Sequence, residues 1–384
     1  MKKCLILMRN SPGYSGGRYN ALIFSLALVR AGYIVEIQTN IIPDFVSDFK
    51  EYKELKKIKF TQNINSLPIN SSPQDLVVLF PDLNPFSAIY EKSVILSKKN
   101  NSKLILHSFE TPNWFNNHGT SSRRYFHWIG WKFLSKYTSS IITMTKKGVD
   151  EALKYYENKK IFNAYPSINE ICADRNFTDT KQKKIFIISR FGKFQNHKGG
   201  DKLEILFKKC FSGYTFIFFG AMPAKIKSRI KNLSKEFNIS LQFISNVSDS
   251  EKFSYLSECE SLIFLSSFEG YGYPPLEAAY VGTPSIIYPL EVFKETLGNF
   301  PMYINSHEDI ENNYHDFLKK YDPHKAKSEI FKDKSFMDYS HQINKIIEES
   351  DSIKTIPKIE YTIIWIRYLI MFFINKLNEI KKSF

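Results

Sequence analysis

The chain has 384 residues, 43% hydrophobic and 24% charged, which is typical of a globular protein with two domains. This composition excludes a disordered tail, a collagen-like repeat and a multi-span membrane protein. Lys and Arg number 53 against 39 Asp and Glu, and residues 1–250 alone hold 38 basic and 19 acidic side chains. The first part of the chain is therefore expected to face a nucleic acid, an anionic membrane or a phosphorylated substrate.

The first apolar run, residues 4–8, is too short for the hydrophobic region of a signal peptide and predicts a buried strand. Four cysteines are scattered without any C-x-x-C pair, which favours free thiols in a reducing compartment. We therefore expect a cytoplasmic protein.

Short apolar runs then alternate with longer amphipathic segments. A helix is expected over 18–31, with Gly32 at the position of a C-cap glycine. Strands are expected at 5–8, 34–38, 76–80, 103–107 and 141–143. This order predicts parallel βαβ units whose strands are buried on both faces.

The strands stop after Lys154, where the chain becomes polar, and restart near Lys184. Strands are then expected at 185–189, 215–219, 241–244, 261–265 and 284–287, and helices at 201–209, 225–237, 249–258 and 274–281. The predicted fold is α/β, with two tandem doubly wound, Rossmann-like domains and a deep cleft between them. The expected limits are 1–166 and 185–334 for the domains, 167–184 for a linker, 335–350 for a closing helix and 351–384 for a C-terminal extension.

The segment 267–280 follows an apolar strand and leads into a helix. Gly270 and Gly272 permit a tight loop that a ligand can approach closely, and two prolines suit the first helical turn. The positive end of the helix would then favour a phosphate. Glu269 and Glu277 flank this loop, and Glu277 can accept hydrogen bonds from hydroxyls. Any fragment of this string is more often an ordinary turn, so the prediction depends on the combination.

A second segment places Arg190 directly after a strand and Lys198 before the next helix. Two cations at the carboxyl edge of a parallel sheet can neutralise a diphosphate, with Arg giving a bidentate grip. Taken alone, an ordinary charged surface loop explains this segment equally well.

Together these residues resemble the glycosyltransferases of the GT-B fold, in the large retaining family numbered four and of the bacterial surface-polysaccharide type. The E-x7-E motif of that family corresponds to Glu269 and Glu277. Gly220 after a strand, the pair Gly16 and Gly17 near the start, and the turn at 280–287 resemble further family segments. The resemblance covers residues 1–349.

The resemblance implies transfer of a sugar from a nucleotide-sugar donor to a hydroxyl of a glycan or lipid-linked acceptor, with retention of anomeric configuration. Lipopolysaccharide, O-antigen or capsule would be the product. Arg190 and Lys198 would hold the donor diphosphate, although the long interval between them makes Lys193 an alternative to Lys198. Glu277 would bind the ribose.

The resemblance also assigns the sugar pocket. Glu269 and the backbone of Gly270, Tyr271, Gly272 and Tyr273 would bind the donor sugar, where Phe and Leu are more usual than the two tyrosines. Gly16, Gly17 and Gly220 would lie beside the nucleotide. His107 resembles a histidine near the sugar, but a lone histidine at a strand end is more often structural.

No Asp-x-Asp pair occurs in the sequence, so we expect no metal ion and no cofactor besides the substrate. Nucleotide-sugar epimerases and phosphorylases share the fold and remain alternatives, as does a non-catalytic binding subunit. The sequence has no zinc module or RNA-binding aromatic motif, and we expect no nucleic acid partner.

Two stretches suggest peripheral contact with an anionic membrane. Residues 121–137 are basic and aromatic, which fits either an interfacial helix or an ordinary helix whose aromatics pack inward. In the extension, 359–384, the apolar run 361–374 is interrupted by Arg367 and falls short of the roughly 20 residues that span a bilayer. It could bind a membrane, the protein body or a second subunit.

Overall fold

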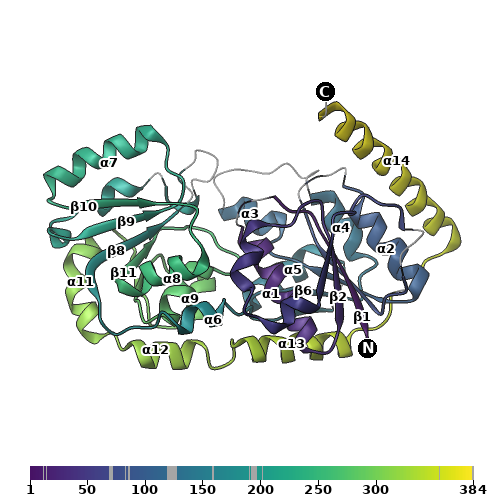
Figure 1. Cartoon of the computed structure of the whole chain (residues 1–384), viewed down its shortest axis with the longest axis horizontal. Coiled ribbons are helices and arrows are strands. Elements are labelled where there is room, and N and C mark those ends of the chain that lie inside the picture. Colours follow the sequence, from purple (N-terminus) through teal and green to yellow (C-terminus); the bar gives the residue numbers. More distant parts are fainter. Residues whose placement is uncertain are drawn as a thin grey trace. The chain divides into compact units, whose positions relative to one another are not determined.

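The computed structural model describes residues 1–11, 13, 15–68, 72–82, 84, 87–118, 128–157, 160–189, 191, 197–200, 202–353 and 355–382. The chain forms two compact units (Figure 1). The first unit comprises Met1–Asn113, Arg123–Pro166 and Phe336–Phe384, and the second comprises Trp114–Ser122 and Ser167–Ser335. The first unit is therefore assembled from both ends of the sequence.

The first unit is built on a seven-stranded sheet in which all neighbours are parallel. In chain order the strands are β1 (Lys3–Met8), β2 (Ile34–Gln38), β3 (Ile58–Thr61), β4 (Leu76–Phe80), β5 (Lys103–His107), β6 (Ser140–Thr143) and β7 (Ile161–Asn163). Their order across the sheet is β3-β2-β1-β4-β5-β6-β7, so the winding reverses between β1 and β4. β4 is buried throughout because both sheet faces are covered, which explains its continuous apolar sequence.

The first unit also contains helices, some of which have clear local start signals. They are α1 (Gly16–Arg30), α2 (Ile89–Asn100), α4 (Ile129–Ser135), α5 (Lys146–Tyr155), α13 (Phe336–Glu349) and α14 (Lys358–Lys382), with 3-10 turns at Asp44–Phe49 and Lys53–Lys57. The Ser15 side chain caps α1 by accepting from the Arg18 N–H, and the Thr145 side chain caps α5 by accepting from the Gly148 N–H. Such caps satisfy N–H groups that have no partner within the helix.

The second unit is a six-stranded parallel sheet ordered β10-β9-β8-β11-β12-β13. Its strands are β8 (Gln182–Ile188), β9 (Thr215–Phe219), β10 (Ser240–Ile244), β11 (Cys259–Phe264), β12 (Ser285–Ile287) and β13 (Met302–Tyr303). Its helices are α6 (Glu170–Asp174), α7 (Ala224–Glu236), α8 (Asp249–Glu258), α9 (Tyr273–Tyr280), α10 (Glu291–Leu297), α11 (Glu308–Lys320) and α12 (Pro323–Ile330), while α3 (Pro112–His118) contains the boundary between the units. Aromatic residues such as Phe211, Phe216 and Phe218 fill much of its core.

Every strand expected from the sequence is present, with ends within three residues of the prediction. β3, β7 and β13 were not predicted. The helix expected at 201–209 is wrong: the described part of this segment forms the 3-10 turns Leu203–Leu206 and Lys209–Phe211. These turns bury Leu203, Leu206 and Phe211, so tertiary packing holds a segment that lacks a helical cap.

The domain limits also differ from those expected. Residues 167–184, expected as a linker, belong to the second unit, because they contain α6 and the first residues of β8. The closing helix α13 and the extension belong to the first unit. α13 packs along α1, where Ser340 Oγ donates to the Ala27 carbonyl at 2.9 Å.

One face of α14 packs on the first unit, beside α2 (Figure 1). Arg367 pairs with Glu91 of α2 at 3.0 Å, and the Tyr368 hydroxyl donates to the Ser66 carbonyl at 3.0 Å. Ile364 on the same face is buried. The arginine that interrupts the apolar run is therefore an anchor of the helix to the protein body.

The opposite face of α14 is exposed and apolar. Its six most exposed apolar side chains recur alternately four and three residues apart: Ile359, Ile363, Ile366, Ile370, Phe373 and Leu377. We call these six residues the α14 stripe. Among the residues that the structure describes, no helix is both long and apolar enough to cross a membrane.

Candidate functional site

The loop between β11 and α9 contains four of the residues predicted to bind the donor: Glu269, Gly270, Tyr271 and Gly272. Gly272 is the N-cap of α9 and has a φ of +87°, a conformation that favours glycine. A Cβ atom here would lie 2.3 Å from Cε1 of Phe293, so no larger residue fits without a shift. Pro274 and Pro275 occupy the first turn, as expected. The positive end of the α9 dipole therefore points to a loop held open by glycine.

Lys198 and Glu269 lie together beside this loop. Lys198 Nζ is 2.6 Å from Glu269 Oε1, and the two side chains are 23% and 11% exposed. The backbone around Lys198 is fixed by Ser189, whose hydroxyl donates to the Lys198 carbonyl at 2.7 Å. Gly199 has a φ of +73°, and a Cβ there would lie 2.4 Å from the Leu265 carbonyl oxygen. The predicted cation is thus held at the carboxyl edge of the sheet.

Glu277 lies in a buried ionic cluster between α8 and α9. Its Oε1 is 2.7 Å from Lys252 Nζ, which also pairs with Asp249 Oδ1 at 2.9 Å. Asn169 then donates to the other oxygen of Asp249 at 3.2 Å. Burial raises the pKa of the Glu277 carboxyl and Asp249 raises it further, while Lys252 opposes the change. Sequence analysis identified Glu277 but missed Lys252.

The other residues of the second unit that were predicted to bind the donor lie after β9, in the β11–α9 loop or at the start of α9. Gly220 follows β9 with a φ of +128°, and a Cβ there would lie 2.7 Å from the Ser189 carbonyl oxygen. Gly270 is half-buried. Tyr271 and Tyr273 are buried, and their rings pack edge to face with centroids 5.1 Å apart. The two tyrosine rings therefore pack inside the unit.

His107, at the end of β5 in the first unit, is completely buried. It stacks on Phe80 with ring centroids 4.7 Å apart, and burial lowers its pKa to about 3. The Tyr339 hydroxyl donates to Asn20 Oδ1, which leaves the Asn20 amide nitrogen to donate to His107 Nε2 at 3.2 Å. The histidine is therefore neutral, with its proton on Nδ1, and its surroundings favour the structural interpretation weighed for it.

Gly16 and Gly17 form the first turn of α1 rather than a free loop. A Cβ on Gly17 would lie 3.1 Å from the ring of Phe109, so the small residue permits close packing after β5. The N-terminal end of α1 lies at the carboxyl edge of the first sheet, where β1 ends.

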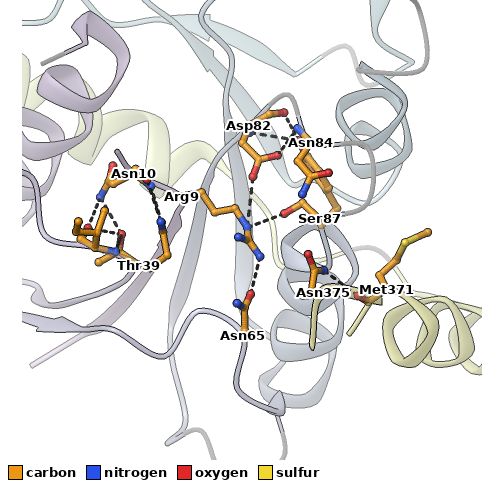
Figure 2. A network of polar contacts seen from close by, with 12 residues as sticks. Arg9, Asn10, Thr39, Asn65, Asp82, Asn84, Ser87, Met371 and Asn375 are labelled. Atoms are coloured by element: carbon orange, nitrogen blue, oxygen red, sulfur yellow. Dashed lines mark hydrogen bonds and ion pairs between the residues drawn. The ribbon is translucent and has the colours of Figure 1, made fainter. Parts of the chain in front are cut away.

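A polar network that sequence analysis missed occupies the same edge (Figure 2). Arg9, directly after β1, donates to Ser87 at 3.2 Å and lies 3.5 Å from Asp82, which follows β4. Asn10 donates to Thr39, which follows β2, at 2.8 Å. Burial raises the pKa of Asp82 while Arg9 lowers it. These residues flank the point where the strand order reverses, the usual ligand position in such sheets. Their signal in the sequence is a polar residue directly after a buried strand.

Two predictions fall partly or wholly outside the described residues. Arg190 and its neighbour Lys193 are outside, as are residues 121–127 of the basic aromatic stretch. In the described remainder of that stretch, Trp128, Trp131 and Leu134 are buried. The aromatic side chains described there pack inward, the second of the two interpretations.

Residues 170–333 match the model of the family described as Glycosyl transferases group 1. This region lies in the second unit and includes Lys198, Glu269 and Glu277. Among curated proteins, the chain is similar to the O-antigen chain mannosyltransferase RfbU of Salmonella typhimurium, with 28% identity over 178 residues. The alignment covers 45% of this chain and 49% of the relative, so the chain spans about half the length of that relative.

Solved structures match nearly the whole chain. HepE of Anabaena, in complex with UDP and glucose, has a TM-score of 0.66 and 12% identity, covering 91% of this chain and 100% of that one. The lipopolysaccharide outer core galactosyltransferase WaaB has a TM-score of 0.58 and 14% identity, covering 91% and 99%. A glycosyltransferase of Rickettsia africae has a TM-score of 0.63 and 15% identity, covering 91% and 98%. At these identities the likeness shows the fold.

The domain match therefore identifies residues 170–333 as a Glycosyl transferases group 1 domain, and the solved structures show that the chain has the GT-B fold. The class and the fold predicted from the sequence are therefore confirmed. The curated relative builds O-antigen chains, according to its name, so the chain resembles enzymes of bacterial surface polysaccharide.

Proposed function

We propose that the protein transfers a sugar from a nucleotide-sugar donor to a hydroxyl of a glycan or lipid-linked acceptor, in the synthesis of lipopolysaccharide, O-antigen or capsule. The transfer retains anomeric configuration and needs no metal ion. The observation that carries this proposal is the pairing of Lys198 with Glu269 beside the glycine-capped start of α9. A fixed cation and a helix N-terminus form a subsite for a diphosphate.

In this proposal, separate residues bind the diphosphate, the sugar and the ribose of the donor. Lys198, together with Arg190, neutralises the diphosphate and stabilises the negative charge that develops as the bond to the sugar breaks. Lys198 pairs with Glu269 in this structure, and its ammonium group can also form an ion pair with the phosphate of a bound donor. Glu269 then accepts hydrogen bonds from hydroxyls of the donor sugar, and Glu277 accepts from the ribose. Protein cations here do the work that a metal ion does elsewhere.

The chemistry of the relatives suggests the donor class. HepE was solved with UDP and glucose, and the curated relative is a mannosyltransferase by name. The first test is therefore thermal unfolding with UDP, GDP, ADP and dTDP, because a ligand that binds only the folded state raises Tm. We expect one nucleotide to raise Tm clearly above the others. No shift with any of them would contradict a nucleotide-sugar donor.

The second test follows turnover of the matching nucleotide sugar with a lipid-linked acceptor extract, in EDTA. We expect full activity in EDTA. We also expect NMR to show the same anomeric configuration in the product as in the donor sugar. Lys198→Ala should lower kcat/KM about a hundredfold, because it removes a charge that stabilises the leaving group. The control is Lys184→Ala, since Lys184 pairs with Glu258 elsewhere in the unit. Loss of activity in EDTA that Mn²⁺ restores, or inversion of configuration, would overturn those parts of the proposal.

We also propose that the protein binds the cytoplasmic face of a membrane peripherally, through the α14 stripe. All six stripe side chains are more than half exposed, which is costly in water. The net charge of +14 favours an anionic surface and disfavours a second copy of the chain. Glu360 and Arg367 of α14 are engaged with Tyr137 and Glu91, so these two charges do not flank the stripe as interhelical partners. Such a helix lies in the plane of the membrane surface.

A further inference from the structure

The buried cluster at Glu277 holds one cation and two carboxylates. Lys252 lies between Asp249 and Glu277, and all three side chains are 7% exposed or less. Its summed charge is therefore negative in a region from which water is largely excluded. A buried excess of negative charge is stabilised by further hydrogen-bond donors.

The two oxygens of Glu277 are not equivalent. Oε1 accepts from Lys252 at 2.7 Å. Among the residues that the structure describes, none donates to Oε2. Glu277 lies on the same short helix, α9, whose N-terminus faces the glycine loop of the diphosphate subsite. Oε2 therefore lacks a hydrogen-bond donor within the described part of the chain. A nucleotide sugar carries hydroxyl groups close to its diphosphate and can supply one.

The position of Lys252 is set by local sequence. Ser248 and Glu251 form a reciprocal capping box that starts α8, which places Asp249 and Lys252 in its first turn. Lys252 Nζ also lies 4.8 Å from the centre of the Phe253 ring. These contacts fix the ammonium group, so that it can fix Glu277 in turn.

We propose that Lys252 is a positioning residue for recognition of the vicinal hydroxyls of the nucleotide ribose: by occupying Oε1 of Glu277, it keeps this side chain a carboxylate and directs Oε2 to the ribose. The inference rests on the proposed function, because the ribose belongs to the donor. It assigns a role to a lysine on α8 that neither the sequence motif nor the comparisons identify. Lys252 touches no substrate and acts through Glu277.

The test compares binding of ribonucleoside diphosphates with that of their 2′,3′-dideoxy counterparts, by titration calorimetry on the full chain. Wild type should prefer the ribonucleotide about tenfold or more, as expected for hydrogen bonds to a charged group. Lys252→Met should lose this preference while inorganic pyrophosphate binds as in wild type. Lys252→Arg should keep part of it, because it keeps the charge. Lys184→Met, which breaks an ion pair of 2.8 Å elsewhere in the unit, should behave as wild type.

Two further variants cover a folding failure of Lys252→Met, which leaves two buried carboxylates without a cation. Asp249→Asn keeps the Lys252–Glu277 pair and should keep the ribose preference. The double variant Asp249→Asn/Lys252→Met leaves one carboxylate and should lose it. If the double variant keeps the preference, or if Lys252→Met folds and keeps it, Lys252 has only a structural role.

Failure of the proposed function gives a different pattern. If wild type binds no nucleoside diphosphate, the donor class is wrong. If wild type binds and discriminates but the Lys252 variants discriminate equally, the donor class stands and only this inference falls.

Discussion

Gly272 forms the N-cap of α9. Replacing it would have two separate energetic costs, one from the backbone conformation and one from a steric contact. Gly272 combines a positive φ with a neighbouring ring, Phe293, that a Cβ would strike. Gly213 has a similar φ of +80° with nothing within 4 Å, so it carries the conformational cost alone. The two positions therefore form a matched pair.

We predict that Gly213→Ala lowers the free energy of unfolding by roughly 1 kcal/mol, the cost of a left-handed alanine. Gly272→Ala should cost about 2 kcal/mol more, because the ring of Phe293 must move. It should also weaken nucleotide binding, whereas Gly213→Ala should not. Urea unfolding and calorimetry measure both effects. Equal stability losses in the two variants would mean that the contact with Phe293 is relaxed at little cost.

His107 gives a prediction about pH. Its folded pKa of about 3 lies below the ordinary value of 6.5, so between these values the unfolded state binds more protons than the folded state. Stability should therefore fall as pH falls through about 6.5, and the contribution of His107 from about pH 7 to pH 5 is roughly 2 kcal/mol.

The measurement is the free energy of unfolding at both pH values for wild type and His107→Gln, which cannot titrate. The fall in stability should be smaller in the variant by about that amount, whatever its absolute stability. If the two proteins lose the same stability, His107 is not held neutral. The pH profile of kcat for the wild-type enzyme should also show no ionisation of the His107 ring near neutral pH.

At the scale of elements, α14 allows the two faces of one helix to be tested separately. We predict that replacing Ile363, Ile366, Ile370 and Phe373 by Ser abolishes flotation with anionic liposomes, since each large apolar side chain contributes about 2 kcal/mol on burial. The Tm should change little, because the contacts of Ile364, Arg367 and Tyr368 with the body remain.

The control is Arg367→Met, which breaks the pair with Glu91 and should lower Tm while the stripe still binds lipid. Wild-type flotation should increase with anionic lipid and weaken with salt, as expected for the cationic part of binding. If wild type remains in solution with every liposome and elutes as a dimer, the stripe is a subunit interface.

The elements show where prediction from sequence succeeds. Strands such as β4 are buried on both faces, and this burial is written locally as an unbroken apolar run. β3 is only partly buried and includes an exposed lysine, and β13 has only two residues. Neither strand therefore produces an unbroken apolar run. The glycine loop with Glu269 and Glu277 could also be predicted, because its signal is contained in one short stretch of sequence. The partners of these residues, Lys198 and Lys252, come from distant segments, and spacing in the sequence does not reveal which lysine pairs with which carboxylate.

At the scale of the whole molecule, the division into units could not be read in chain order. A polar stretch after residue 154 indicated a boundary, and the structure places one at Pro166. The return of α13 and α14 to the first unit depends on contacts across more than 300 residues, such as Tyr339 with Asn20 and Ser340 with Ala27. No local pattern encodes which sheet a late helix will join.

That return has a consequence during translation. A ribosome delivers α1 and the strands of the first unit early, but α13, whose Tyr339 holds the amide of Asn20 against His107, emerges only after residue 335. The second unit can finish folding while the first still lacks a helix, because domains fold as units during synthesis. A chain interrupted before α13 therefore carries a folded second unit and an unfinished first unit with exposed apolar surface. Such a product is a natural target for chaperones and proteases, and the cell obtains the first unit in its final form only from chains whose synthesis has passed α13.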